Sequence, residues 1–307
     1  MGSEEQLLEE LRPRAFAIAY RMLGSVSEAE DVVQEGLLRL HQALARGEAI
    51  DSPPAYLATV VTRLAIDELR SARARRETYV GEWMPEPLVT DDRDDPARQA
   101  ETADSLSMAF LVLLESLSPE QRAVFLLREV FDYPYERIAE MVGRSEDATR
   151  QIAVRARRHV DQGKPRFEAD AERRDELADR FFEAVMEGEL SGLEALLTED
   201  VELHGDGGGK APALARAVHG RARVARTLSA WRKAGALFGG AWFERMDVNG
   251  QPGAVARSSD GRVFAVISLD VAEGRVQGIR SVVNPDKLRH VGPVVNLGEL
   301  LRQRRSG

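Results

Sequence analysis

The spacing of apolar residues changes along this chain of 307 residues, and the change rules out a single uniform fold. Over 1–76 and again over about 104–163, apolar residues recur every three or four positions, as in helices that bury one face. Over 263–271 they instead occupy every second position, as in a strand with one buried face. The pattern predicts two helical domains followed by an α+β domain.

The C-terminal domain is expected to begin at residue 168 and to combine helices with an antiparallel meander. Helices are predicted at 170–187, at 191–197 and after Gly220. Three hairpin dipeptides, spaced 11 and 13 residues apart, then separate the strands: Asn249-Gly250, Asp260-Gly261 and Glu273-Gly274. The domain, 168–307, is therefore predicted to be a meander packed on helices.

Charge is distributed unevenly over the chain, whose formal net charge is −9. Residues 63–76 carry five Arg against two acids, a net of +3, and residues 144–166 carry seven basic residues against three acids, a net of +4. Between them, residues 77–104 carry nine acids against two Arg, a net of −7, and three prolines. Two basic segments joined by a linker at 77–103, expected to be poorly ordered in places, can span two separated DNA elements.

Several classes of protein are excluded by what the sequence lacks. There is no cysteine, which excludes disulfides and thiolate metal sites and suits a reducing compartment. No apolar run approaches the roughly 18 residues needed to span a bilayer, and the N-terminus shows no apolar signal segment. We therefore expect a cytoplasmic protein with no membrane contact, no metal and no cofactor.

Capping residues mark the starts of helices. Ser27, with a glutamate three residues later, predicts a helix that starts there. Ser52 before Pro53 predicts another, because serine caps a helix and proline fits its first turn. Ser118, with a glutamine three residues later, predicts a third.

Residues 135–158 match a helix-turn-helix. Ala139 offers a small side chain where the helices cross, Gly143 permits the turn, and Ser145 caps the second helix. That second helix presents Arg and Gln side chains that can reach base edges or phosphates in a major groove. A solvated, arginine-rich helix in an all-α domain would show the same pattern, so these residues alone leave both interpretations open.

Three stretches resemble the two conserved domains of extracytoplasmic-function sigma factors: AEDVVQEGLLRL (29–40), AYLATVVTRLAIDELRSARARRE (55–77) and LSPEQRAVFLLREVFDYPYERIAEMVGRSEDATRQIAVRARRHV (117–160). The resemblance covers roughly residues 5–163. It implies a factor that directs core RNA polymerase to promoters and does no catalysis, with region 2 at 1–76 and region 4 at 104–163. A stand-alone DNA-binding repressor is the alternative.

The resemblance assigns residues to three surfaces. Core polymerase is expected to bind Asp31, Gln34, Glu35 and Leu38. The promoter −10 element is expected to bind Arg63, Asp67, Arg70 and Arg73. The −35 element is expected to bind Ser145, Arg150, Gln151, Arg155 and Arg158. Thr149 departs from the family, where a branched aliphatic residue is usual, and is expected to loosen helix packing slightly.

Three further stretches resemble the subgroup of these factors with a fused SnoaL-like domain: WMPEP (83–87), DGGGK (206–210) and NPDKL (284–288). The resemblance implies an α+β cone, shared with nuclear transport factor 2 and ketosteroid isomerase, that regulates the factor in place of a separate anti-sigma protein. The regulatory contact is expected to involve Trp83, Pro85, Asp206, Gly207, Gly208, Gly209, Lys210, Asn284 and Asp286. We expect the glycine loop to dock on the 1–76 domain or on the linker.

Two other roles for the cone stay open at the level of sequence. Relatives of this fold use a pocket Asp or His as a general base. The candidates here are His204, Asp206 and His219. The cone could instead bind an unknown small ligand. A P-loop is excluded, because Gly205 and Gly209 are one residue too close and Ala211 replaces the required hydroxyl residue.

Overall fold

The computed structural model describes residues 3–90, 105–163, 170–188, 190–236 and 240–295. Contacts divide the chain into two compact units. The helical unit comprises residues 1–78 and 111–164, and the sheet unit comprises 79–110 and 165–307. Within the predicted linker at 77–103, residues 77 and 78 belong to the helical unit and residues 79–90 to the sheet unit.

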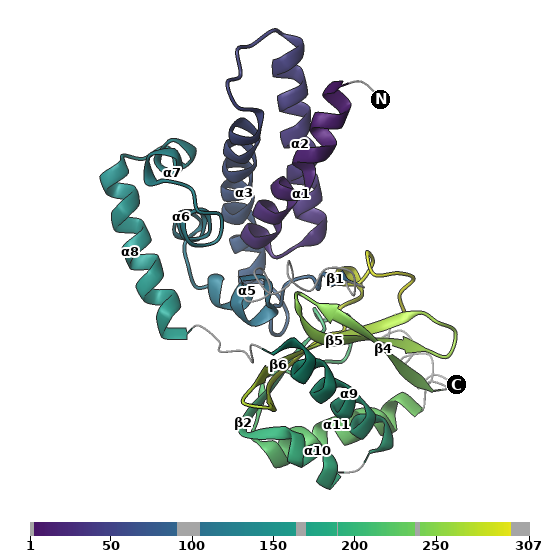
Figure 1. Ribbon diagram of the computed structural model, residues 1–307. Coiled ribbons are helices and arrows are strands. Elements are labelled where there is room, and N and C mark those ends of the chain that lie inside the picture. Colours follow the sequence, from purple (N-terminus) through teal and green to yellow (C-terminus); the bar gives the residue numbers. More distant parts are fainter. Residues whose placement is uncertain (1–2, 91–104, 164–169, 189, 237–239, 296–307) are drawn as a thin grey trace. The chain divides into compact units, whose positions relative to one another are not determined.

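The helical unit consists of two helical groups (Figure 1). The first group is α1 (Ser3–Leu23), α2 (Val26–Ala45) and α3 (Pro53–Glu77). The second is α6 (Pro119–Glu129), α7 (Tyr135–Val142) and α8 (Glu146–Gly163), preceded by α5 (Met108–Leu114), which contains the boundary between the two units. The predicted helix-turn-helix is α7 and α8, and Gly143 between them has the left-handed φ of 67° that the turn requires.

Two of the three predicted helix starts are confirmed. Ser52 Oγ accepts from the Ala55 amide at 3.4 Å, and Ser118 forms a complete capping box. The predicted start at Ser27 is wrong, because Ser25 caps α2 by accepting from the Glu28 amide at 3.2 Å. Ser25 lies directly after the turn that ends α1, so it is the last residue before the chain becomes helical again.

The sheet unit contains one mixed sheet with strand order β1-β4-β5-β6-β7-β2-β3. The strands are β1 (Val89–Thr90), β2 (Leu197–Asp206), β3 (Val218–His219), β4 (Ala241–Val248), β5 (Gln251–Ser258), β6 (Val263–Ala272) and β7 (Arg275–Val282). The antiparallel meander β4–β7 is confirmed, with its turns at the three predicted dipeptides. The sheet is not wholly antiparallel, however, because β2 pairs with β7 in parallel.

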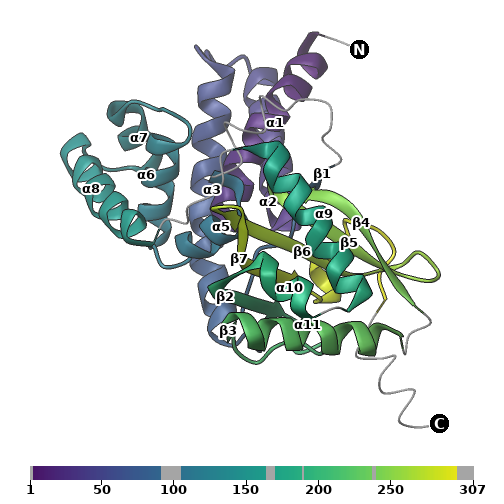
Figure 2. The ribbon, with the colours of Figure 1, turned by 60° about the horizontal axis from the view of Figure 1, so that its bottom comes forward.

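Helices cover one face of this sheet. They are α9 (Ala171–Glu187), α10 (Leu190–Leu196) and α11 (Arg221–Ala236) (Figure 2). Phe181, Phe182 and Leu193 from these helices pack against Ile267 and Ile279 of the sheet. The predicted fold class, helical domains followed by an α+β cone, is confirmed.

The other face of the sheet is covered by the chain that precedes the unit's helices. Residues 79–90, which we call the strap, cross this face and end as strand β1 on the edge of β4. Met84 of the strap and Met108 pack there with Val266, Val282 and Leu288. Consequently β6 is buried on both faces, although its alternating apolar residues predicted that only one face would be buried.

Candidate polymerase and promoter interface

The four residues expected to bind core polymerase lie on α2. Gln34 and Glu35 lie three and four positions after Asp31, and Leu38 lies three positions after Glu35. Residues at these spacings share one side of a helix. Leu38 is 47% exposed, whereas the next residue along the core side, Leu40, is buried. An exposed leucine beside acidic side chains is a surface that a protein partner can cover.

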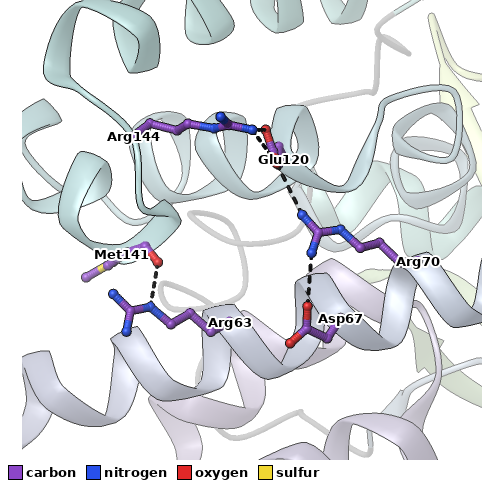
Figure 3. A network of polar contacts seen from close by, with 6 residues as sticks. All are labelled: Arg63, Asp67, Arg70, Glu120, Met141 and Arg144. Carbon is purple, nitrogen blue, oxygen red and sulfur yellow. Dashed lines mark hydrogen bonds and ion pairs between the residues drawn. The ribbon is translucent and has the colours of Figure 1, made fainter.

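Arg63, expected at the −10 element, is bound within the chain. Its Nε donates to the Met141 carbonyl at 3.0 Å (Figure 3). Its Nη2 donates to the Glu140 carbonyl at 2.8 Å. Both carbonyls belong to the last turn of α7, where no helical partner exists for them. A cation at this end also interacts with the negative end of the helix dipole. Arg63 of α3 therefore caps the first helix of the helix-turn-helix.

Glu120, in the first turn of α6, joins Arg70 to Arg144 (Figure 3). Its Oε1 accepts from Arg70 Nη2 at 3.2 Å and from Arg144 Nη2 at 2.9 Å. Arg70 Nη1 also donates to Asp67 Oδ1 at 3.1 Å. Arg63, Asp67 and Arg70, three of the four residues expected at the −10 element, thus all have partners within the chain. The side chain of Arg73 lies outside the described residues.

A buried arginine makes a second contact between the two helical groups. Arg122 of α6 is 1% exposed, and its Nε donates to the Arg21 carbonyl at 3.1 Å. Its Nη1 forms an ion pair with Glu115. Arg21 is itself buried, and this burial lowers the pKa of its guanidinium to about 10. The Arg21 carbonyl lies in the last turn of α1, so Arg122 of the second group caps a helix of the first. Arg63 of the first group likewise caps α7 of the second.

The recognition helix α8 leaves its predicted residues exposed. These are Ser145, Arg150, Gln151, Arg155 and Arg158. Arg150 forms an ion pair with Glu146 and lies 4.6 Å from the ring centroid of Tyr135. Val154 on the same helix is 66% exposed. These contacts hold Arg150 at the start of the helix, where recognition helices reach base edges.

Thr149, the departure from the family pattern, lies on the buried side of α8. It is 0% exposed, and its Oγ1 donates to the Ser145 carbonyl at 2.9 Å. Because that bond satisfies the hydroxyl, the substitution introduces no unpaired buried polar atom here.

In the sheet unit, Asp206 at the end of β2 pins the strap. It is 0% exposed, and Oδ1 accepts from the Tyr79 hydroxyl at 2.5 Å. Oδ2 accepts from the Met84 amide at 2.9 Å and from Lys287 Nζ at 2.7 Å. Burial and the hydrogen bond to Asp206 raise the pKa of the Tyr79 hydroxyl above its usual range. Lys287 Nζ also lies 4.4 Å from the ring centroid of Trp83, within cation–π range.

The other expected regulatory residues surround this point. Gly208 lies against Asn284, whose Nδ2 donates to the Tyr79 hydroxyl at 2.9 Å, and Gly209 lies against Val80. Pro85 is buried in the strap, and Gly207 packs closely on the turn that follows it. Lys210 forms an exposed ion pair with Asp286, which holds the pKa of that carboxyl below its usual range. The glycine loop therefore contacts the linker, which was one of its two expected docking partners.

Comparison with known proteins places this geometry in a family. Models of sigma-70 region 2 and of sigma-70 region 4 match residues 7–75 and 107–160. The ECF RNA polymerase sigma factor SigJ of Mycobacterium tuberculosis strain H37Rv is 39% identical, covering 91% of each chain. The probable ECF sigma factor SigI of the same species is 31% identical, over 90% of this chain and 92% of that one.

The crystal structure of M. tuberculosis SigJ matches 94% of this chain and 99% of its own, with a TM-score of 0.75 and 35% identity. The match spans both units. The chain belongs to the extracytoplasmic-function (ECF) sigma factors. The predicted class is confirmed, and the partners of this sigma factor are core RNA polymerase and promoter DNA. No helix among the described residues is long and apolar enough to cross a membrane.

The three residues considered as general bases all have partners within the sheet unit. Both Asp206 oxygens already accept hydrogen bonds. His204 lies between Glu82 and Glu202, with N–O distances of 2.7 and 3.1 Å, and His219 lies 3.1 Å from Glu202. Each of the three candidates is thus held by a neighbouring group of the sheet unit.

Sequence reasoning missed several residues of this sigma factor that make the most specific contacts. In the helical unit these are Glu120, Arg122 and Arg144, which lie in the region 4 stretch without any local signal of their role. In the sheet unit they are Tyr79 and Lys287. Lys287 belongs to the NPDKL stretch, so its neighbours pointed to the right place, but only the fold shows that its side chain is buried.

Gly208 offers a test of how closely the loop and the strap must approach. It has a φ of +56°, and a Cβ there would lie 3.0 Å from the Tyr79 hydroxyl and closer still to Asn284 Nδ2. Gly208→Ala is expected to cost about 1–2 kcal/mol for the backbone and about 1–3 kcal/mol more for the clash. Gly274→Ala is the matched control, because Gly274 has a φ of +69° and nothing within 4 Å of a Cβ. Equal losses in thermal unfolding of the two variants would contradict the close approach.

Proposed function

We propose that the free sigma factor holds its −10-binding surface closed against region 4 and opens it when it binds core polymerase and promoter DNA. The closed form is the arrangement of the helical unit described above. In it, region 4 lies on the −10-binding side of region 2.

The observation that carries the proposal is the double use of Arg63 and Arg70. Both are expected at the −10 element, and both donate to groups of region 4. The N–H groups of a guanidinium are fixed in one plane, so those that bond Glu140, Met141 and Glu120 are not free for phosphates or bases. Closure and −10 binding therefore compete for the same donors.

Once open, three surfaces act together. The exposed face of α2 around Leu38 binds core polymerase, and α3 binds the −10 element. Recognition helix α8 enters the −35 major groove, where Arg150 and Gln151 read base edges and Arg155 and Arg158 contact phosphates. The exposure of α8 supports this role, because its side chains can reach DNA without a change in the helix itself.

The C-terminal domain regulates by holding the strap. The strap is part of the chain that joins region 2 to region 4, so its attachment to the cone limits how that connection can move. Asp206, Lys287 and the loop at 207–210 are the residues that hold it. This supports regulation by contact, in place of a separate anti-sigma protein, over catalysis or ligand sensing in the cone.

Glu120→Ala tests the competition, because Glu120 is in no surface proposed to bind DNA. A partly exposed ion pair contributes about 1 kcal/mol or less, so its loss should shift the closed–open equilibrium by up to about fivefold. Since the chain has no cysteine, spin labels at Ala45→Cys and Asp161→Cys can report the distance between the two groups. We expect longer distances and tighter binding of a single-stranded −10 oligonucleotide.

Glu48→Ala is the control. It removes a surface ion pair with Arg46 that lies wholly within the region 2 group. If Glu120→Ala changed neither the label distances nor the oligonucleotide affinity beyond this control, closure would not compete with −10 binding.

A further inference from the structure

The most basic segment of the chain lies in neither promoter-binding domain. Residues 207–243 contain seven Lys and Arg residues and no Asp or Glu, a net of +7 in a chain of net −9. They are Lys210, Arg216, Arg221, Arg223, Arg226, Arg232 and Lys233. The two segments that the family uses for DNA carry only +3 and +4. A charge imbalance of this size on one domain attracts a polyanion.

Three of these arginines form an exposed surface on α11 and the loop before it. Arg216, Arg223 and Arg226 are exposed, and none has a carboxylate within ion-pair distance among the described residues. Arg223 and Arg226 are three positions apart, so they are neighbours on one side of the helix. Lys210 is excluded from this surface, because it is paired with Asp286.

Four other surface arginines of the same unit are neutralised locally. Arg245 pairs with Asp179, Arg257 with Glu244, Arg262 with Asp260 and Arg289 with Asp286. The contrast matters, because a solvated protein surface normally intersperses charges of both signs. Arg216, Arg223 and Arg226 instead have no carboxylate partner among the described residues, so their guanidinium groups are available to an anion from outside the chain.

Arg223 and Arg226 border an apolar hollow on this surface. Arg223 and Arg226 line a shallow hollow of about 440 Å³, together with Val218, Thr227, Ala230 and Trp231. Val218 and Trp231 pack against the core of the cone, so they form an apolar floor and leave the cations at the rim. Phosphate groups along a nucleic-acid strand can bond such rim arginines through bidentate hydrogen bonds.

We propose that the surface formed by Arg216, Arg223 and Arg226 is a third DNA contact of this sigma factor and binds the phosphate backbone of duplex promoter DNA. Duplex DNA is the polyanion that this family already brings to the chain, and the contact adds affinity without reading sequence. The C-terminal domain thereby has a positive role in the promoter complex in addition to holding the strap.

The test is the salt dependence of promoter binding by the complex of core polymerase with the full chain. Each lost phosphate contact lowers the slope of log K against log salt by about 0.9, so Arg216→Ala/Arg223→Ala/Arg226→Ala should lower it by about 2–3. The control, Arg173→Ala/Arg180→Ala/Arg275→Ala, removes three exposed arginines from the same unit and changes the net charge equally. Its slope should stay close to that of the unchanged chain.

A second measurement locates the contact independently of affinity. Ala230→Cys places the only thiol of the chain at the hollow, where it can carry an iron chelate that cleaves nearby DNA. We expect cleavage confined to one stretch of the duplex, lost in the triple arginine variant. Equal slopes for the two triple variants, or a label that cleaves polymerase or the sigma factor but not DNA, would overturn the proposal. Neither result would bear on the closed form of the helical unit, whose test uses Glu120.

Discussion

Asp206→Ala is expected to destabilise the SnoaL-like domain by about 3–5 kcal/mol, because it leaves the buried ammonium of Lys287 without its counter-ion. The Tyr79 hydroxyl and the Met84 amide lose their acceptor in the same step. Calorimetric unfolding should show a midpoint lower by about 10 °C, and hydrogen exchange at the Met84 amide should accelerate.

Two further variants separate this effect from general damage. Adding Lys287→Met to Asp206→Ala removes both charges and should recover part of the loss, because no unpaired ion is left buried. Lys210→Ala breaks the exposed pair with Asp286 and should cost about 1 kcal/mol or less. A loss for Asp206→Ala no greater than that for Lys210→Ala would refute the role of Asp206 as the residue that pins the strap.

Arg122→Met is expected to open the helical unit far more than Glu120→Ala. Arg122 is 1% exposed, and its substitution removes both its hydrogen bond to the Arg21 carbonyl of the other helical group and its ion pair with Glu115. The bond to the Arg21 carbonyl exists only in the closed form, and a hydrogen bond from a charged group contributes about 1.5–3 kcal/mol, so its loss should shift the equilibrium toward the open form by about 10- to 100-fold. The free sigma factor should then bind a −10 oligonucleotide tightly without polymerase.

The variant must be shown to open rather than to unfold. Far-ultraviolet circular dichroism should stay unchanged while the distances between labels on the two helical groups increase. Arg137→Met is the control, since Arg137 pairs with Glu140 within α7 and contributes nothing to the contact between the groups. Loss of helical signal together with loss of −35 binding would show that Arg122 supports the fold of region 4 itself.

Much of the architecture could be predicted because its signals are local. The capping box at Ser118, the turn at Gly143 and the hairpin dipeptides each depend on residues within four positions of one another. The placement of the recognition helix followed from these signals. The error at Ser27 has the same origin, because two serines two positions apart offer similar caps and only the packing of α1 against α2 decides between them.

What the tertiary structure alone decided is which distant groups these local elements bring together. The carbonyls that Arg63 caps lie 77 and 78 residues away, and the amide that Asp206 holds lies 122 residues away. No periodicity or motif encodes such a pair, because a backbone carbonyl or amide is present at nearly every position and its availability depends on where a helix or strand ends. The sequence therefore determined the elements, the family and the surfaces expected to meet polymerase and DNA. Burial and the unpaired ends of helices decided that Arg63 and Arg70, expected at the −10 element, bond to region 4 and that residues 79–90 cover one face of the sheet.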